Sequence, residues 1–161
     1  MDLEGRALDP FSNPGNGVVL VFLQPDCPIA NRYAPEIQRL HQIHQTDGIR
    51  FFLVYADPSM TGELARKHLQ EFNYRIPALL DPRQVLVRKS RATVTPEAAF
   101  FSKTGALLYH GRIDDRYVDF GKERPAAIRQ ELKEAIESSL VGKPVKSSFE
   151  RAVGCYIPKL N

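Results

Sequence analysis

The sequence predicts a single α/β domain with a mixed central sheet and helices on both faces of that sheet. Two apolar runs, residues 18–23 and 49–56, have the composition of buried central strands. Helical patterns alternate with these runs, which is typical of parallel β-α-β units. Two further strands flank Lys103-Thr-Gly105, which predicts a hairpin and therefore antiparallel strands at one side of the sheet.

The predicted elements follow the order β-α-β-α-β-α-β-β-α. Residues up to Gly17 are rich in Pro, Gly, Asn and Asp and predict an irregular lead-in. The predicted strands are 18–24, 49–56, 77–80, 97–102 and 106–110, all bounded by turn residues. The predicted helices are 28–44, 61–72, 82–90 and 124–140. The last segment, residues 141–161, is a polar tail that we expect to be irregular.

Apolar residues at helical spacing indicate where the helices lie. In the first helix Ile29, Tyr33, Ile37 and Leu40 fall on one face, and Thr61 is a suitable N-cap for the second. No internal repeat and no linker interrupts this pattern, so we expect residues 1–161 to form one domain.

Composition excludes several classes of protein. The chain has 43% hydrophobic and 25% charged residues, as is typical of soluble globular domains, and its net charge is only +3. Its tightest basic group, residues 83–91, lacks interleaved aromatic residues, so we expect no nucleic-acid partner. No apolar run is long enough to span a membrane. The N-terminus carries no apolar signal segment.

Cys27 lies where the first predicted strand meets the first predicted helix. Pro28 suits the first helical position, and the free N–H groups of a helix N-terminus stabilise a thiolate. The position therefore predicts a reactive cysteine, although a buried cysteine that only fills the core is the alternative. The other cysteine, Cys155, lies in the tail. Two distant cysteines form neither a disulfide scaffold nor a metal-binding pair, and they are either independent thiols or one redox couple.

Three segments carry a resemblance to a known fold family. Asp26-Cys-Pro-Ile-Ala-Asn-Arg-Tyr-Ala-Pro35 is similar to the active-site helix of thioredoxins, and Val94-Thr-Pro96 is similar to their cis-proline loop. The segment 111–117 resembles the redoxin branch, which includes the AhpC/TSA and TlpA-like proteins. Over residues 15–140 the chain thus resembles the thioredoxin fold. The resemblance implies that Cys27 is the nucleophile, that Pro35 kinks the helix, and that Thr95 and a cis Pro96 contact substrate beside it, together with Pro28.

The sequence also departs from these families. Ala30 stands where thioredoxins have the second cysteine of Cys-x-x-Cys, so a resolving thiol must come from elsewhere. Asp26 replaces the usual tryptophan, and its carboxylate opposes a neighbouring thiolate. Leu20 and Gln24 occupy the positions of the peroxiredoxin proline and threonine, which argues against a conventional peroxide site.

Three functions remain open at this point. The first is thiol–disulfide exchange in which Cys27 attacks and Cys155 resolves the mixed disulfide. The second is a one-cysteine peroxidase or redox sensor, in which Cys27 forms a sulfenic acid and Arg91 or Arg112 supplies a cation. The third is a binding module that has lost its redox pair and binds a metal or a partner, with His110 or the pair His41 and His44 as possible ligands.

We favour the first function. The sequence then predicts catalytic Cys27 and Cys155, a substrate-binding surface at Thr95, Pro96 and Pro28, and neither an organic cofactor nor a metal. The expected partner is a thiol or disulfide protein or a small thiol. The resemblance favours an extracytoplasmic location, since disulfide chemistry persists in oxidising compartments. The sequence leaves the oligomeric state undefined.

Overall fold

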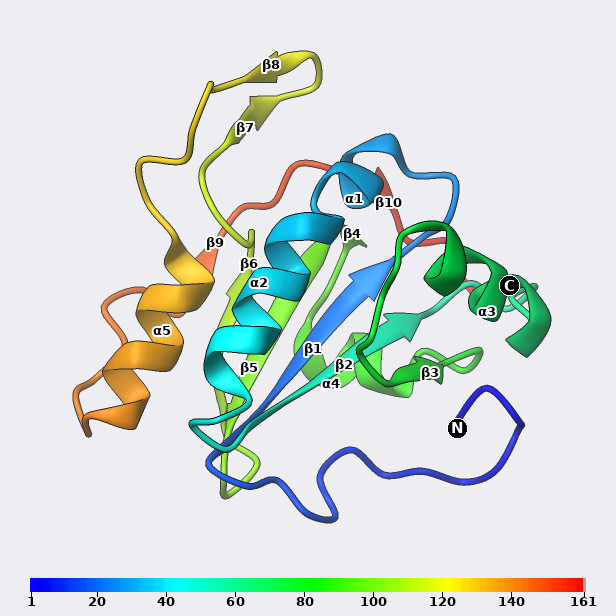
Figure 1. Cartoon of the computed structure of the whole chain (residues 1–161), viewed down its shortest axis with the longest axis horizontal. Helices are drawn as coiled ribbons and strands as arrows, with labels where there is room; N and C mark the ends of the chain where they lie inside the picture. The colour runs from blue at the N-terminus through cyan, green and yellow to red at the C-terminus, as the bar shows by residue number, and fades with distance from the viewer. Residues whose placement is uncertain (161) are drawn as a thin grey trace.

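A computed structural model describes residues 1–160. Its centre is a six-stranded mixed sheet in the order β3-β2-β1-β5-β6-β9 (Figure 1). The strands of this sheet are β1 (Gly17–Leu23), β2 (Ile49–Tyr55), β3 (Ala78–Leu80), β5 (Glu97–Ser102), β6 (Leu107–Gly111) and β9 (Phe149–Glu150). β1, β2 and β3 are mutually parallel, whereas β5 runs antiparallel to β1 and to β6. The predicted combination of a parallel core and an antiparallel hairpin is therefore confirmed.

Two small sheets and five helices complete the described chain. One small sheet joins β4 (Val94–Thr95) to β10 (Cys155–Tyr156), and the other joins β7 (Tyr117–Asp119) to β8 (Lys122–Glu123). The helices are α1 (Pro28–Arg32), α2 (Ala34–His44), α3 (Gly62–Glu71), α4 (Val85–Ser90) and α5 (Glu131–Leu140). None of the helices within residues 1–160 is both long and apolar enough to cross a membrane.

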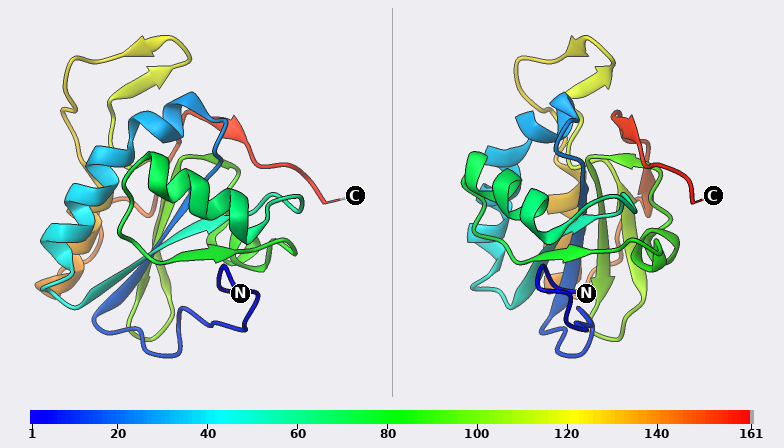
Figure 2. Two further views of the ribbon diagram at one scale, coloured as in Figure 1. Left: turned by 45° about the vertical axis from the view of Figure 1, so that its right-hand side comes forward. Right: turned by 90° about the vertical axis from the view of Figure 1, so that its right-hand side faces the viewer.

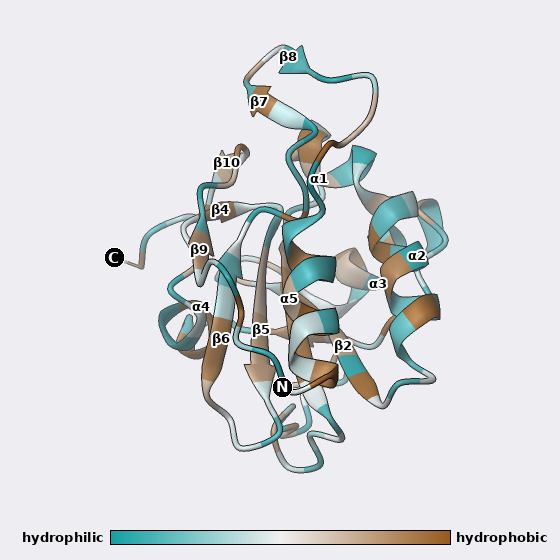
Figure 3. Cartoon of the chain, turned by 90° about the vertical axis from the view of Figure 1, so that its left-hand side faces the viewer, coloured by the Kyte–Doolittle hydropathy of each residue, from teal (hydrophilic) through white to brown (hydrophobic). Residues whose placement is uncertain are grey.

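Alternate residues of the central strands supply two separate cores. In β1, Val19 and Val21 face the layer of α1, α2, α3 and α5, while Leu20 and Phe22 face the side covered by α4. This division follows from the two-residue period of a strand. The arrangement confirms the prediction that helices cover both faces, and the views in Figure 2 show the helices on either side of the twisted sheet. Figure 3 shows the apolar strands β5 and β6 between these layers.

The first predicted helix is divided into α1 and α2. Pro35 has no N–H, so it cannot donate to the carbonyl of Asn31 as a continuous helix requires. The chain instead turns at Tyr33, whose N–H reaches the carbonyls of Ala30 at 3.1 Å and Ile29 at 3.3 Å. The helix then resumes, and Ile37 donates to the carbonyl of Tyr33 at 2.9 Å. The break lets α1 hold the cysteine while α2 packs along the sheet.

The last helix begins at Glu131, seven residues later than the predicted start at 124. The preceding chain forms the β7–β8 hairpin, which projects from the top of the fold in Figure 1. Oδ1 of Asp115 then accepts hydrogen bonds from the N–H groups of Ile128 at 2.7 Å and Arg129 at 3.0 Å. These contacts hold residues 128–129 outside a helix, so the predicted helical pattern is realised only from Glu131 onward.

The segment 141–161 was expected to be irregular, but its described part contains β9 and β10. β9 joins the edge of the central sheet parallel to β6, with Phe149 opposite His110 and Glu150 opposite Gly111. The close approach requires glycine at position 111, because a Cβ there would lie 1.9 Å from the Glu150 carbonyl oxygen. This anchorage directs the following residues back across the end of β1, toward the start of α1.

Candidate functional site

Cys27 occupies the N-cap position of α1, immediately after the loop that leaves β1. Its side chain is fully buried, with 0% exposure, and belongs to the core that the sheet shares with α2 and α5. The Cys27 Sγ donates a hydrogen bond to the carbonyl oxygen of Thr95 at 3.0 Å. The thiol is therefore held against the backbone of a loop that lies far away in the sequence.

That loop contains the Thr95–Pro96 peptide bond, which is cis, as the resemblance implies. Directly after it, the buried carboxylate of Glu97 turns back toward the loop. Its Oε2 accepts hydrogen bonds from the N–H groups of Thr93 at 2.8 Å and Val94 at 3.2 Å. Buried donors that are satisfied in this way fix the loop, and with it the carbonyl that receives the Cys27 thiol.

Cys155 reaches the same loop from the other side. In the antiparallel pair of β10 with β4, Cys155 lies opposite Thr95, the residue whose carbonyl accepts from Cys27. Gly154 makes this approach possible, because a Cβ at that position would lie only 2.0 Å from the Thr95 carbonyl oxygen. The fold thus brings together the two cysteines that the sequence places far apart, and both are free thiols.

The pKa of the Cys155 thiol is raised to about 12. Burial is the largest cause, since it disfavours the charged form. The neighbouring Cys27 side chain and the negative charge of Asp26 act in the same direction. Cys155 therefore keeps its proton at neutral pH while the pair is reduced.

A network of polar side chains connects α1 to α3 and to β2. Nδ2 of Asn31 donates to the carbonyl of Pro25 at 2.7 Å, so its Oδ1 is left to accept from Nε2 of His68 at 2.8 Å. Nδ1 of His68 then accepts from the hydroxyl of Tyr55 at 2.6 Å. Every ring nitrogen is thus satisfied with His68 neutral, and burial lowers the pKa of this histidine. The sequence analysis missed this network; a histidine on the apolar face of a predicted helix was the available signal.

A cleft of about 290 Å³ opens beside Cys155, between α1 and the β7–β8 hairpin. Pro28 and Arg32 line it from α1, and Phe120 and Glu123 line it from the hairpin. Arg32 lies 3.6 Å from Glu123 across this space, so the two charges compensate each other. Of the predicted site residues, Cys27, Cys155, Thr95, Pro96 and Pro28 are thus gathered at one end of the sheet.

The residues predicted as a candidate cation or as metal ligands make contacts that involve neither cysteine. Nε of Arg112 donates to Glu131 at 2.9 Å, which ties this arginine to α5. Nδ1 of His44 lies 3.0 Å from Asp47, and Nδ1 of His110 lies 3.6 Å from Glu97. Within residues 1–160, no group of three or more His, Cys, Asp and Glu side chains could hold a metal ion.

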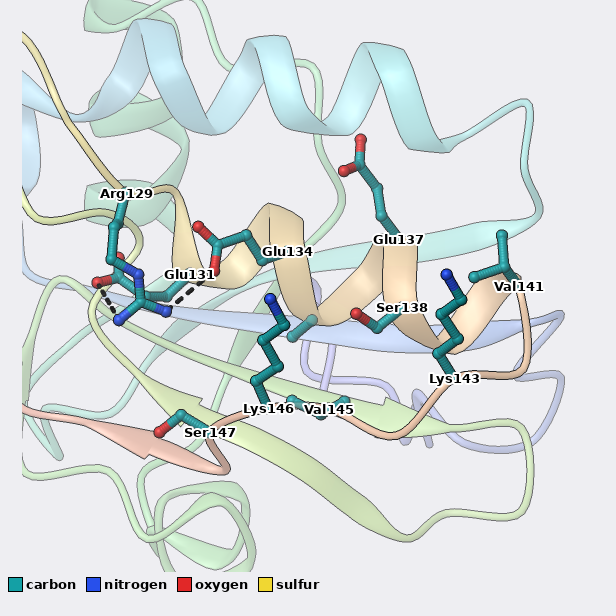
Figure 4. Close-up of a pocket in the computed structure, with 11 residues that line it drawn as sticks. Arg129, Glu131, Glu134, Glu137, Ser138, Val141, Lys143, Val145, Lys146 and Ser147 are labelled. Carbon is teal, nitrogen blue, oxygen red and sulfur yellow. Dashed lines mark hydrogen bonds and ion pairs between the residues drawn. The ribbon is translucent and has the colours of Figure 1, made fainter.

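A second hollow, of about 330 Å³, lies between α5 and the chain that follows it (Figure 4). Charged side chains dominate its wall, and Arg129 pairs there with Glu134 at 3.0 Å. Its lining residues include neither cysteine. The chemistry of the two thiols is therefore associated with the cleft at α1.

Comparison with known proteins identifies the fold. No family model matches the sequence, and no curated protein matches it. An uncharacterised conserved protein from Geobacillus kaustophilus has a TM-score of 0.83 at 21% identity, over 99% of this chain and 87% of the other. A hypothetical protein from Sinorhizobium meliloti has a TM-score of 0.81 at 21% identity, over 97% and 87%.

A secreted disulfide oxidoreductase of Mycobacterium tuberculosis is also similar, with a TM-score of 0.61 and 19% identity. The match covers 86% of this chain and 92% of that protein. At these identities the similarities establish the architecture. The chain therefore has the thioredoxin-like fold that residues 26–35 and the cis-proline segment indicate.

Proposed function

We propose that this protein is a thiol–disulfide oxidoreductase whose redox couple is Cys27 and Cys155. One observation carries the proposal: both cysteines are held on Thr95. Cys27 donates to the Thr95 carbonyl, and Cys155 pairs with Thr95 along β10. The fold, which is shared with the M. tuberculosis disulfide oxidoreductase, supports the same chemistry.

The reaction is an exchange of two electrons. Oxidation of the pair removes two electrons and two protons and forms the Cys27–Cys155 disulfide, while a disulfide of the partner is reduced to two thiols. In the opposite direction two partner thiols become a disulfide and the pair is reduced. Cys155 supplies the resolving thiol that thioredoxins carry at the position occupied here by Ala30. In the reduced pair the raised pKa of Cys155 keeps the proton on Cys155.

The predicted substrate-binding residues receive roles in this proposal. Pro28 forms part of the cleft that reaches Cys155. The backbone of Thr95 is already paired with β10, so a partner peptide pairs with Thr95 only after β10 has left β4. Pro96 fixes the direction of the chain beyond that contact. The partner is a protein or small molecule that carries a thiol or a disulfide.

The test is the intact mass after alkylation, with and without prior reduction, followed by peptide mapping. We expect the mildly oxidised monomer to take up no alkylating agent and to yield one linked peptide that contains Cys27 and Cys155. Reduction should then restore two reactive thiols. Two thiols that survive mild oxidation would overturn the proposal. A dimedone adduct on Cys27 without any linked peptide would instead identify a sulfenic acid chemistry.

A further inference from the structure

The sulfurs of Cys27 and Cys155 differ in their exposure to solvent. Cys27 is fully enclosed, whereas Cys155 is partly exposed and lines the cleft between α1 and the β7–β8 hairpin. β10 lies on β4 and so covers Thr95, the residue whose carbonyl binds the Cys27 thiol. In this arrangement a molecule that approaches from solvent meets Cys155 first.

Access matters because thiol–disulfide exchange is directional. A thiolate attacks one sulfur of the disulfide and expels the other, and the more acidic of the two thiols is the better leaving group. A leaving thiolate at Cys155 is disfavoured, because burial and the neighbouring charge raise the pKa of this thiol. The burial of Cys27 favours attack on Cys155 for a separate reason, which is that an external thiol reaches only the partly exposed Cys155 sulfur.

On the basis of the redox couple proposed above, we infer that an external thiol attacks the sulfur of Cys155 through the cleft beside α1. The partner thiolate forms a new S–S bond to Cys155, the Cys27–Cys155 bond breaks, and its electron pair leaves with Cys27 as a thiolate. A second thiol of the partner then attacks the partner sulfur of the mixed disulfide. This step releases the oxidised partner and leaves Cys155 to take up a proton. The assignment reverses the roles that the resemblance implies, where the cysteine at the head of the helix meets the partner.

The surroundings of Cys155 indicate the class of partner. A hollow of about 660 Å³ lies on the side of β10 that faces the hairpin, and it shares Tyr117 and Phe120 with the cleft. Large apolar side chains with high exposure line this hollow: Val118 at 55%, Phe120 at 61%, Phe149 at 51% and Tyr156 at 79%. Exposed apolar residues gathered around one hollow are typical of a surface that binds protein.

The charges that line the cleft also favour a polypeptide partner over a small acidic thiol. Arg32 is compensated by Glu123, so the cleft offers no isolated cation to the carboxylates of a small acidic thiol. We therefore assign the partner as a polypeptide that presents a cysteine among apolar residues. A small thiol such as glutathione is the competing class.

The site of attack is tested on the oxidised wild-type protein. It is mixed with a limiting amount of an apolar cysteine peptide, quenched with acid and mapped by mass spectrometry. We expect the peptide on Cys155 and a free thiol at Cys27. Two variants trap the same bond stably: Cys27→Ser retains Cys155, and Cys155→Ser retains Cys27. In each variant the remaining cysteine is first converted to its mixed disulfide with thionitrobenzoate and then treated with the peptide thiol, and release of thionitrobenzoate from Cys27→Ser should be at least tenfold faster. Attachment to Cys27, or equal rates, would overturn the inference.

The class of partner is tested with Phe120→Ala. This variant should react several-fold more slowly with the apolar peptide and at an unchanged rate with glutathione. Ile128→Ala is the matched control, since Ile128 is exposed but lines neither the cleft nor the hollow. Equal slowing with both thiols, or no effect with either, would contradict a polypeptide partner.

These results separate the inference from the proposed function. If oxidation yields no Cys27–Cys155 peptide, the redox couple itself is wrong. If that peptide forms but the partner attaches to Cys27, the couple stands and only the order of attack is wrong.

Discussion

Nε2 of His68, on α3, donates a hydrogen bond to Oδ1 of Asn31, on α1, at 2.8 Å. The same asparagine donates to the carbonyl of Pro25, in the loop that precedes Cys27. The loop of the candidate site is therefore tied through α1 to a second helix. A protonated ring would carry a hydrogen on Nδ1 as well and could no longer accept from Tyr55.

We expect the protein to lose stability as the pH falls below about 6.5, the ordinary value for histidine. Burial lowers the pKa of His68 in the folded state, so the unfolded chain binds more protons there. Stability then rises with pH, and the loss is complete below the pKa of the folded state. Urea unfolding between pH 5 and 8 measures this dependence, and it should weaken in His68→Gln. A ring of His68 that titrates at or above its ordinary pKa, followed by NMR, would contradict the prediction.

Gly154→Ala should separate the two cysteines. The added Cβ would meet the backbone carbonyl of Thr95, at 2.0 Å from its oxygen and 2.6 Å from its carbon, so β10 must move off β4. We expect Cys27–Cys155 cross-linking to slow at least tenfold and alkylation of Cys27 to become faster. The control is Lys143→Ala, an exposed change in the same segment. An unchanged rate of cross-linking in Gly154→Ala would show that pairing with β4 does not position Cys155.

Tyr33→Phe should destabilise the fold by about 1–3 kcal/mol, the range for a buried group that loses its hydrogen-bond partner. The Tyr33 hydroxyl donates to Oδ1 of the buried Asp114 at 2.5 Å, and this carboxylate raises the pKa of Tyr33 together with burial, which is the larger cause. Tyr156→Phe is the matched control because its side chain is exposed. Thermal or urea unfolding of both variants gives the comparison. Equal stabilities would mean that the Asp114 carboxylate is satisfied without Tyr33.

Oxidation should stabilise the domain toward urea. A disulfide between Cys27 and Cys155 would close a loop on the order of 100 residues, which corresponds to an upper value of roughly 4–5 kcal/mol on the loop-entropy model. The measurement compares the unfolding of the oxidised and reduced wild-type protein with that of Cys155→Ser under the same conditions. The variant should show no difference between oxidising and reducing buffers. An oxidised wild-type protein of unchanged or lower stability would indicate a strained cross-link.

Local patterns were sufficient for the parts of the fold that local interactions determine. The apolar run before Cys27 predicts β1, Pro28 predicts the start of α1, and Thr61 indeed caps α3 by accepting from the N–H of Leu64 at 3.2 Å. Each of these features depends on residues within a few positions of one another.

The features that the sequence left open depend on distant contacts. β9 and β10 are two residues long and are defined by their partners β6 and β4, so no periodicity indicates them. The same holds for the link between Asn31 and His68, which joins two helices. The sequence predicts no element between residues 111 and 123, because β7 and β8 are only three and two residues long and lack a periodic pattern around Gly121, which has a φ of +70°. The proximity of Cys155 to Cys27 therefore remained one of two alternatives at the level of sequence.

The pairing of β10 with β4 has a consequence for the order in which the protein is made. A chain emerging from the ribosome presents Cys27 and the Thr95 loop long before β9 and Cys155 are synthesised. During that interval the nascent chain carries a single cysteine, and β4 lacks its partner strand. The finished chain can close its own disulfide, but the growing chain can react only with outside thiols, so its protection during synthesis depends on the redox state of the surrounding compartment.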